Sequence, residues 1–307
     1  MKFTSGNNGS ASLLTTLMAA VIITVGLGFS WLVKEHMKAS EGLRNKAEAI
    51  LEARSAYDTV LYFLLNGEVS RKGIVTTISD EICGLKELPL NGQKVALSDD
   101  LYVRAQDSNG MLTLASMNAA ALERLIRKVG GLDDPSGIIN SYMDWIDEDN
   151  FERLNGAEEF YYKGQGLPYV PRNYAIQYKD EVELIKGMNG ELYRKIEPYL
   201  TILPATGFNP NTASDEVLMA YLNINEESLK SLKNYVSKMA VTSDIELFTL
   251  TGRTIVVDGE RVYFSPSPFI EITVSAGRTR SIYTIKAGLD TRQNLRSPYG
   301  ILYWREE

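Results

Sequence analysis

The apolar run from Leu13 to Val33 constrains this chain most, because it holds about 21 residues without a formal charge. A helix rises about 1.5 Å per residue, so a run of this length crosses the hydrocarbon core of a bilayer. Lys34 and Glu35 follow at once, which places the end of the run at a water boundary. A core helix rarely needs so long an uncharged run, and a cleavable secretory signal is usually shorter. We therefore expect one membrane anchor at residues 10–33.

The helical pattern continues beyond the anchor to about Leu65, with apolar residues three and four positions apart. No proline interrupts it, and Asn66-Gly67 is a pair suited to a left-handed helix end. One helix of roughly 50 residues is expected, half in lipid and half packed on a folded domain. A tether with a coiled-coil stalk is the alternative, although no sustained heptad repeat supports it.

Composition excludes several classes of function. The 307 residues have room for the anchor and about two folded domains, and the net charge of −7 argues against a nucleic-acid partner. The single cysteine, Cys83, excludes an intramolecular disulfide. The single histidine, His36, lies at the membrane edge, which excludes a His-rich metal site and a Ser-His or Cys-His catalytic pair in the rest of the chain.

Two strand-like runs, at 101–106 and 111–114, are joined by Asp107-Ser108-Asn109-Gly110, whose Asn-Gly pair predicts a β-hairpin. The pattern is then mainly helical to about residue 250. Asn118 and either Asn211 or Thr212 are expected to cap helices in this part.

Alternation of apolar and polar residues returns around two further hairpin pairs, Asp258-Gly259 and Ala276-Gly277, and a last strand is expected at 299–305. The sheet that begins at Leu101 therefore resumes after the helical part. This order predicts an α+β fold, a long N-terminal helix on an antiparallel sheet with an inserted all-α domain. The expected divisions are 1–9 leader, 10–33 transmembrane helix, 34–115 helix and first strands, 116–250 inserted α-helical domain, and 251–307 remaining strands.

Five carboxylates gather near the middle of the chain. Asp144, Asp147 and Asp149 surround the end of a predicted helix, and Glu158 and Glu159 follow a glycine turn. Grouped carboxylates repel one another unless a cation lies among them, and hard oxygen ligands suit Ca²⁺. The spacing is not that of an EF-hand loop.

A solvated acidic loop, in which Asp147 caps a helix or pairs with Arg153, is the alternative to a calcium site. Trp145 and the Tyr161-Tyr162 pair are expected in the core. Two acids can also hydrolyse glycosides, but the sequence does not give their separation and shows no sugar-stacking cleft. Nothing supplies a matched acid and base, so no enzymatic activity is expected.

A polar leader, MKFTSGNNG, ends at Gly9 and is followed by Ser10. It resembles a type IV prepilin-like signal, in which a membrane peptidase cuts after the glycine and the apolar helix stays on the mature protein. Most such pilins carry a glutamate at the fifth mature position. This chain has Leu14 there for a cut after Gly9, and Thr15 for a cut after Ser10. The absence is typical of the minor pseudopilin K of type II secretion systems.

Motifs along the rest of the chain resemble the same family and stand in its order. They are Asp144-Trp145-x-Asp147-x-Asp149, Asn155-Gly156-Ala157-Glu158, Tyr169-x-x-x-Asn173, Asn209-x-Asn211-Thr212-Ala213 and Tyr303-Trp304-Arg305-Glu306.

The resemblance implies a pilin-like fold with an inserted domain similar to SAM or helix-hairpin-helix bundles, and calcium binding in that domain. It implies a non-enzymatic minor pseudopilin at the tip of a periplasmic pseudopilus, with Leu13, Leu14 and Val33 in a single anchor in the bacterial inner membrane. The implied partners are minor pseudopilins of the I, J and H types, the inner-membrane platform of the secretion system, and the prepilin peptidase, with N-methylation after its cut.

Two alternatives remain. One is a minor pilin of a related type IV pilus or competence filament. The other is a membrane-anchored helix-hairpin-helix DNA receptor, since such receptors carry the Asn-x-Asn-Thr-Ala motif found here at 209–213. Their hairpin needs a Gly-rich turn near basic residues, whereas this chain has Asn223 to Glu227 in an acidic domain. A helical unit that binds protein is therefore expected.

Overall fold

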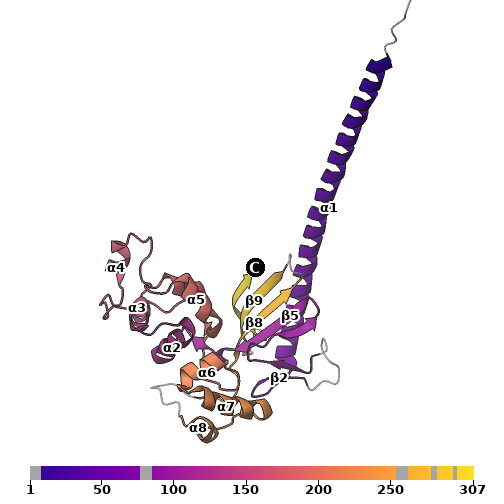
Figure 1. Ribbon diagram of the computed structural model, residues 1–307. Helices are drawn as coiled ribbons and strands as arrows, with labels where there is room; N and C mark the ends of the chain where they lie inside the picture. Colours follow the sequence, from indigo (N-terminus) through magenta and orange to yellow (C-terminus); the bar gives the residue numbers. More distant parts are fainter. Residues whose placement is uncertain (1–7, 77–84, 254–261, 278–281, 293–295) are drawn as a thin grey trace, which may run out of the picture.

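The computed structural model describes residues 8–76, 85–253, 262–277, 282–292 and 296–307 (Figure 1). The hairpin predicted around Asp258-Gly259, the leader before Asn8, and Cys83 lie outside these residues. The helices are α1 (Asn8–Asn66), α2 (Ala119–Leu125), α3 (Ser136–Ile146), α4 (Glu159–Gly164), α5 (Gly190–Ile196), α6 (Asp215–Leu222), α7 (Glu226–Lys238) and α8 (Asp244–Thr251), with short turns η1 (Ser108–Gly110), η2 (Ile126–Gly130), η3 (Lys179–Leu184) and η4 (Glu197–Tyr199). The strands are β1 (Glu68–Val69), β2 (Gly73–Val75), β3 (Glu87–Pro89), β4 (Val95–Ser98), β5 (Leu101–Asp107), β6 (Leu112–Thr113), β7 (Leu200–Thr201), β8 (Phe269–Ala276), β9 (Tyr283–Asp290) and β10 (Gly300–Glu306).

Helix α1 has two halves with different surroundings, and Figure 1 shows the first half projecting far from the rest of the chain. The large apolar side chains between Leu13 and Val33 are exposed, whereas Ala53, Val60 and Phe63 are buried in the core beneath the sheet. Among the described residues, α1 is the one helix long and apolar enough to cross a membrane, judged by length and composition. The long helix expected from the sequence is therefore confirmed.

The end of α1 differs from the prediction. Gly67 does not adopt a left-handed backbone, and its N–H donates to the carbonyl oxygen of Phe63 at 2.9 Å. Strand β2 approaches so closely that a Cβ on Gly67 would lie 2.3 Å from Cγ2 of Ile74. Glycine is thus required here by the close approach of a neighbouring strand, not by the backbone angle.

Five antiparallel strands form the main sheet, in the order β10-β9-β8-β5-β4. Strand β5 pairs with β8 along its whole length, from Leu101 opposite Ala276 to Asp107 opposite Ile270. Strands β8 and β9 pair as the predicted hairpin, and β10 adds the predicted last strand. The sheet therefore does begin before the helical part and resume after it.

The hairpin predicted for residues 101–114 is wrong. After β5 the chain turns through η1, and β6 pairs in parallel with β7 in a separate two-stranded sheet. The cause lies in Asp107, whose carboxylate accepts a hydrogen bond from the N–H of Asn109 at 3.1 Å and so caps a 3-10 turn. The side chain of Asn109 is held by Thr206, at 2.9 Å, instead of taking part in a left-handed hairpin turn.

The helix caps are predicted correctly in one case and incorrectly in the other. Asn118 caps α2, and its side chain accepts a hydrogen bond from the N–H of Ala121. Ser214, not Asn211 or Thr212, caps α6. The reason is that these two side chains are engaged inside the protein, where polar groups need partners.

Two separate hydrophobic cores result. The first lies between α1 and the main sheet and includes Val60 and Ile272. The second lies within the helical part and includes Trp145 and Leu218. In Figure 1, α2 to α8 lie to the left of and below the sheet, while α1 rises on its right.

A buried polar network joins the two cores at Asp107, which is fully buried. Its Oδ1 accepts from the N–H of Ser267 at 2.8 Å, and its Oδ2 accepts from Thr212 Oγ1 at 2.8 Å and Asn209 Nδ2 at 3.1 Å. Burial raises the pKa of this carboxyl, and the bonds from Ser267, Thr212 and Asn109 oppose that rise. The network thus connects the end of β5, the segment that returns to β8, and the Asn-x-Asn-Thr-Ala segment.

We expect Asp107→Ala to lower the free energy of unfolding of the full chain by about 3 kcal/mol, because several buried donors lose their acceptor. Urea unfolding in detergent, followed by tryptophan fluorescence, measures the change. Asp133→Ala, at an exposed position, is the matched control and should alter stability by less than about 0.5 kcal/mol. Equal stability of the two variants would contradict the role assigned to Asp107.

Candidate functional site

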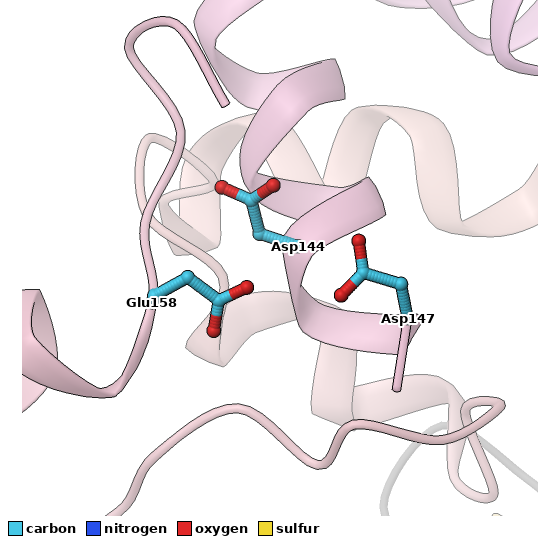
Figure 2. Close-up of side chains that lie close together, drawn as sticks. All are labelled: Asp144, Asp147 and Glu158. Carbon is cyan, nitrogen blue, oxygen red and sulfur yellow. The ribbon is translucent and has the colours of Figure 1, made fainter. Parts of the chain in front are cut away.

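Three of the five carboxylates considered as metal ligands come together at one end of the helical part (Figure 2). Asp144 lies in the last turn of α3, Asp147 directly follows α3, and Glu158 directly precedes α4. One carboxylate oxygen from each lies within 4.8 Å of the others. Asp144 and Asp147 are neighbours because residues three apart share a face of a helix. The loop after α3 then brings Glu158 back beside them.

This loop folds closely around Asp144. The Oδ2 atom of Asp144 accepts hydrogen bonds from the backbone N–H of Ala157 at 2.8 Å and from the backbone N–H of Arg153 at 3.2 Å. Gly156 lies so near that a Cβ there would be 1.9 Å from the same oxygen. From outside, Lys186 Nζ donates to the carbonyl oxygen of Gly156 at 2.7 Å. The Asn-Gly-Ala part of the sequence motif therefore wraps around a carboxylate, and Lys186, distant in sequence, holds it there.

Arg153 neutralises part of the group. Its Nη1 donates to Asp144 Oδ1 at 2.7 Å and also to Asp147. The hydrogen bonds to Asp147 and Asp144 raise the pKa of the guanidinium, so it stays charged. The Arg153 side chain is 38% exposed, whereas that of Asp144 is fully buried. The pairing of Asp147 with Arg153, one of the possibilities left open by the sequence, is present.

Glu158 is the unsatisfied member of the group. It is only 3% exposed, and neither of its carboxylate oxygens has a hydrogen-bond partner. Oδ1 of Asp147 is likewise buried without a partner. Burial, and then the charges of Asp144 and Asp147, raise the pKa of Glu158 to about 7. Figure 2 shows its carboxyl group pointing toward the other two.

The carboxylate oxygens of this group are suitable ligands for a calcium ion. With all three carboxylates ionised, the group and Arg153 together would carry two negative charges in excess, which a divalent cation would match. Ca²⁺ takes about six to eight oxygen ligands and accepts carboxylates and backbone carbonyls. The oxygens without partners, both of Glu158 and Oδ1 of Asp147, are the ones that would hold it. Asp144 would orient the loop, since both of its oxygens already accept hydrogen bonds.

Asp149 and Glu159 lie outside this group of three. Asp149 Oδ1 accepts from the N–H of Phe151 at 2.8 Å, which stabilises the turn that follows it. Glu159 forms an ion pair with Lys163 one turn further along α4. Both residues were predicted as ligands because they lie next to the site in the sequence, but each side chain bonds to a partner outside it.

An aromatic layer supports the site from inside. Trp145 and Tyr162 are almost fully buried and meet edge-on, with 5.4 Å between ring centroids, while Tyr161 is partly buried beside them. Trp145 Nε1 donates to Glu181 at 2.9 Å, and Arg172 forms an ion pair with the same carboxylate. Burial disfavours the charge of Glu181, yet the bonds from Arg172 and Trp145 hold its pKa below the usual range.

The polar side chains of the Asn-x-Asn-Thr-Ala segment are buried and form hydrogen bonds within the protein. Asn209 and Thr212 are fully buried and donate to Asp107. Asn211 is 5% exposed. Its Nδ2 donates to the carbonyl oxygen of Val241 at 3.0 Å, and its Oδ1 accepts from the N–H of Val241 at 2.8 Å. These three side chains are therefore engaged by hydrogen bonds inside the protein.

The residues expected at the processing site and in the anchor lie at the start of α1. Gly9 and Ser10 are within its first turns. Leu13 and Leu14 are 67% and 60% exposed, and Val33 is 38% exposed. Side chains of this kind, left uncovered by the rest of the chain, are what contact with lipid requires.

Comparison with known proteins identifies part of the chain. The family model described as type II secretion system (T2SS), protein K, matches residues 97–205. The type II secretion system protein K of Pectobacterium carotovorum subsp. carotovorum is 29% identical over 137 residues, or 43% of this chain and 42% of that protein. That of Aeromonas hydrophila is 26% identical over 162 residues, or 48% of this chain and 49% of that protein. The matches thus span about half the length of these relatives.

Likeness of fold extends further. A chain in the crystal structure of the GspK-GspI-GspJ complex from the type 2 secretion system of enterotoxigenic Escherichia coli is 18% identical, with a TM-score of 0.51. The match covers 90% of this chain and 99% of that one, so the two share a fold. The resemblance that the motifs indicated is confirmed over residues 97–205, which match the family model of type II secretion system protein K.

Proposed function

We propose that this chain is a minor pseudopilin of a type II secretion system, held in the inner membrane by α1 with its folded part in the periplasm. The continuity of α1 carries the proposal, because one unbroken helix runs from an exposed apolar half into the core of the sheet. Such a helix couples the position of the anchor rigidly to the folded part, as a filament subunit requires. The similarity of residues 97–205 to protein K supports type II secretion among the filament systems.

A place at the tip of the pseudopilus follows from the inserted helical part. It has a core of its own beside the sheet, and its bulk would obstruct the stacking of another subunit above it. The partners would be minor pseudopilins of the I, J and H types, together with the inner-membrane platform. The complex named for GspK, GspI and GspJ in Escherichia coli supports the first two.

The start of the helix fits the same role. A prepilin peptidase would cut after Gly9 or Ser10, and the new N-terminus would be methylated. In lipid an unpaired charge is costly, and the usual glutamate is thought to neutralise the amine of a neighbouring subunit. Leu14 or Thr15 at that position suits a first subunit, which has no earlier amine to neutralise.

Secretion in the source bacterium tests the proposal. A strain without this chain should export far less of its type II substrates to the medium than the parent strain does, since the pseudopilus would lack its tip. The full chain should restore export. A variant lacking residues 116–250 should accumulate in the membrane without restoring export. Normal export in the deletion strain would contradict the function, and rescue by the shortened variant would contradict the tip role.

The cluster of Asp144, Asp147 and Glu158 supports a second part of the proposal, that Asp147 and Glu158 hold a calcium ion. The buried, unpartnered oxygens of Glu158 are the main support. The ion would supply the positive charge that Arg153 only partly provides, and would fix the loop between α3 and α4. Calcium would therefore order one end of the helical part instead of taking part in a reaction.

The acid–base behaviour of Glu158 makes this testable by pH. Its folded pKa of about 7 lies above the ordinary 4.5, so the folded state favours the protonated acid. Its contribution to stability is complete below pH 4.5 and is lost as pH rises through about 7. In a chelator, the free energy of unfolding should thus fall by about 3 kcal/mol between pH 5 and 8. Calcium at pH 8 should reverse the fall.

Glu158→Gln removes the titrating acid and one ligand together. In chelator at pH 8 we expect it to be more stable than the natural chain, and calcium to leave its melting temperature unchanged. Glu159→Gln is the matched control, because Glu159 pairs with Lys163 outside the group and its loss should preserve the response to calcium. Calcium that fails to raise the melting temperature of the natural chain would contradict the site.

A further inference from the structure

The outer face of the main sheet, turned away from α1, carries a row of basic side chains. From one edge to the other the row consists of Lys94, which directly precedes β4, and then Arg104, Thr273, Lys286 and Arg305, each opposite the next. The chain as a whole has a net charge of −7. A row with a cation at four of its five positions is therefore a local reversal of the charge of the protein.

The two cations at one end of the row, Lys286 and Arg305, share a carboxylate of the chain itself. Like charges directly across a ladder repel one another. Oε1 of Glu307 lies 2.7 Å from Nε of Arg305 and 3.5 Å from Nζ of Lys286, and Arg305 also pairs with Asp180 at 3.0 Å. This end of the row is therefore satisfied, and it shows one carboxylate placed between two neighbouring cations.

The two cations at the other end, Lys94 and Arg104, have no such carboxylate among the residues that the structure describes. Nζ of Lys94 lies over the ring of Tyr102, 3.4 Å from its centroid. Arg104 forms neither an ion pair nor a side-chain hydrogen bond with a described residue. Both basic side chains are exposed. Such a pair costs stability unless a negative charge from outside lies between the two cations.

The outer face is hollowed in two places, which share Arg104, Thr273 and Lys286. The first hollow, of about 390 Å³, also includes Lys94. The second, of about 460 Å³, reaches Tyr178 of the helical part. A flat membrane surface would not enter a hollow walled by the helical part. An extended peptide segment would fit along the two hollows, because they continue into one another across the sheet.

The acids that line the two hollows already have partners. Each is bound to a neighbour: Glu197 to Lys179, Glu271 to Tyr303, and both Asp180 and Glu307 to Arg305. None of them forms an ion pair with Lys94 or Arg104 within the described part of the chain. A carboxylate from another molecule would therefore find both of these cations available.

We propose that the outer face of the main sheet binds an acidic segment of a partner protein. A carboxylate of that segment would lie between Lys94 and Arg104, as the carboxylate of Glu307 lies between Lys286 and Arg305. The guanidinium of Arg104 can donate two parallel hydrogen bonds to it. The rest of the segment would extend along the second hollow toward the helical part. This surface is additional to the proposed pseudopilin function and does not depend on it.

Fluorescence anisotropy tests the proposal, with a short labelled peptide in which glutamate alternates with serine and the full chain in a nonionic detergent. The same peptide with glutamine in place of glutamate is the control ligand. The glutamate peptide should bind at least about tenfold more tightly, since its carboxylates form charge-assisted hydrogen bonds. Equal binding of the two peptides would overturn the proposal and leave the pseudopilin function standing.

Three substitutions that each remove one positive charge locate the site. Arg104→Gln and Lys94→Gln should each weaken binding of the glutamate peptide about tenfold. Neither should lower the melting temperature, because each also removes a repulsion between like charges. Lys230→Gln, at an exposed position on α7, is the matched control and should leave binding unchanged. An equal loss of affinity in all three variants would attribute binding to net charge alone and overturn the site.

Glu307→Gln should have the opposite effect, because it removes the chain's own carboxylate from the first hollow. Affinity for the glutamate peptide should rise about threefold, since a repelling charge is lost. Glu227→Gln makes the same change in net charge on α7 and should not alter binding. Unchanged affinity in Glu307→Gln would count against the proposed place of the ligand. Inorganic phosphate that binds more tightly than the peptide would assign the surface to phosphate groups, which also overturns the proposal.

Discussion

The buried carboxylate of Asp107 links the core beneath the main sheet to the core of the helical part. A domain inserted into a sheet is attached where the chain leaves and where it returns. Asp107 ends the strand that leaves, accepts a hydrogen bond from Ser267 on the returning segment, and binds Thr212 of the helical part. Because a buried charge without partners is costly, these segments have to stay together. Asp107 is therefore one of the contacts that fix the orientation of the helical part, together with the ion pair between Arg305 and Asp180.

The same reasoning separates structural acids from candidate ligands. Asp107 and Asp144 are both fully buried, and each accepts several hydrogen bonds from its own chain. Glu158 is almost as deeply buried and accepts none on its side chain. Stability alone does not explain why an acid would be kept in such a place, since an amide or an apolar residue would cost less. The proposed calcium ion would give such an acid a role, because it would supply the partner that the Glu158 side chain lacks.

The sequence predicted the features that depend on long patterns. The uncharged run before Lys34, the helix beyond it and the strands after residue 268 all follow from periodicity, and all are present. It failed where a polar side chain is used over a long distance. Asn109 and Asn211 resemble a hairpin turn and a helix cap locally, but their side chains bind residues far along the chain.

The candidate site was predictable only in part, for the same reason. Asp144, Asp147 and Glu158 could be proposed from a motif, because helix spacing and a glycine turn bring them together. That Glu158 is unsatisfied while Glu159 has a partner depends on which way one turn of backbone faces. Nothing in the sequence indicated a role for Lys186, because its contact with Gly156 joins two segments that only the fold brings together.

The mass of the mature N-terminus, measured on the chain from cells with and without prepilin peptidase, tests the central claim most directly. A pseudopilin should lose its leader after Gly9 or Ser10 only when the peptidase is present, keep the whole of α1, and gain a methyl group. An intact Met1 in both strains, or a cut beyond Val33, would contradict the account, because α1 would then be a plain tether or a discarded signal.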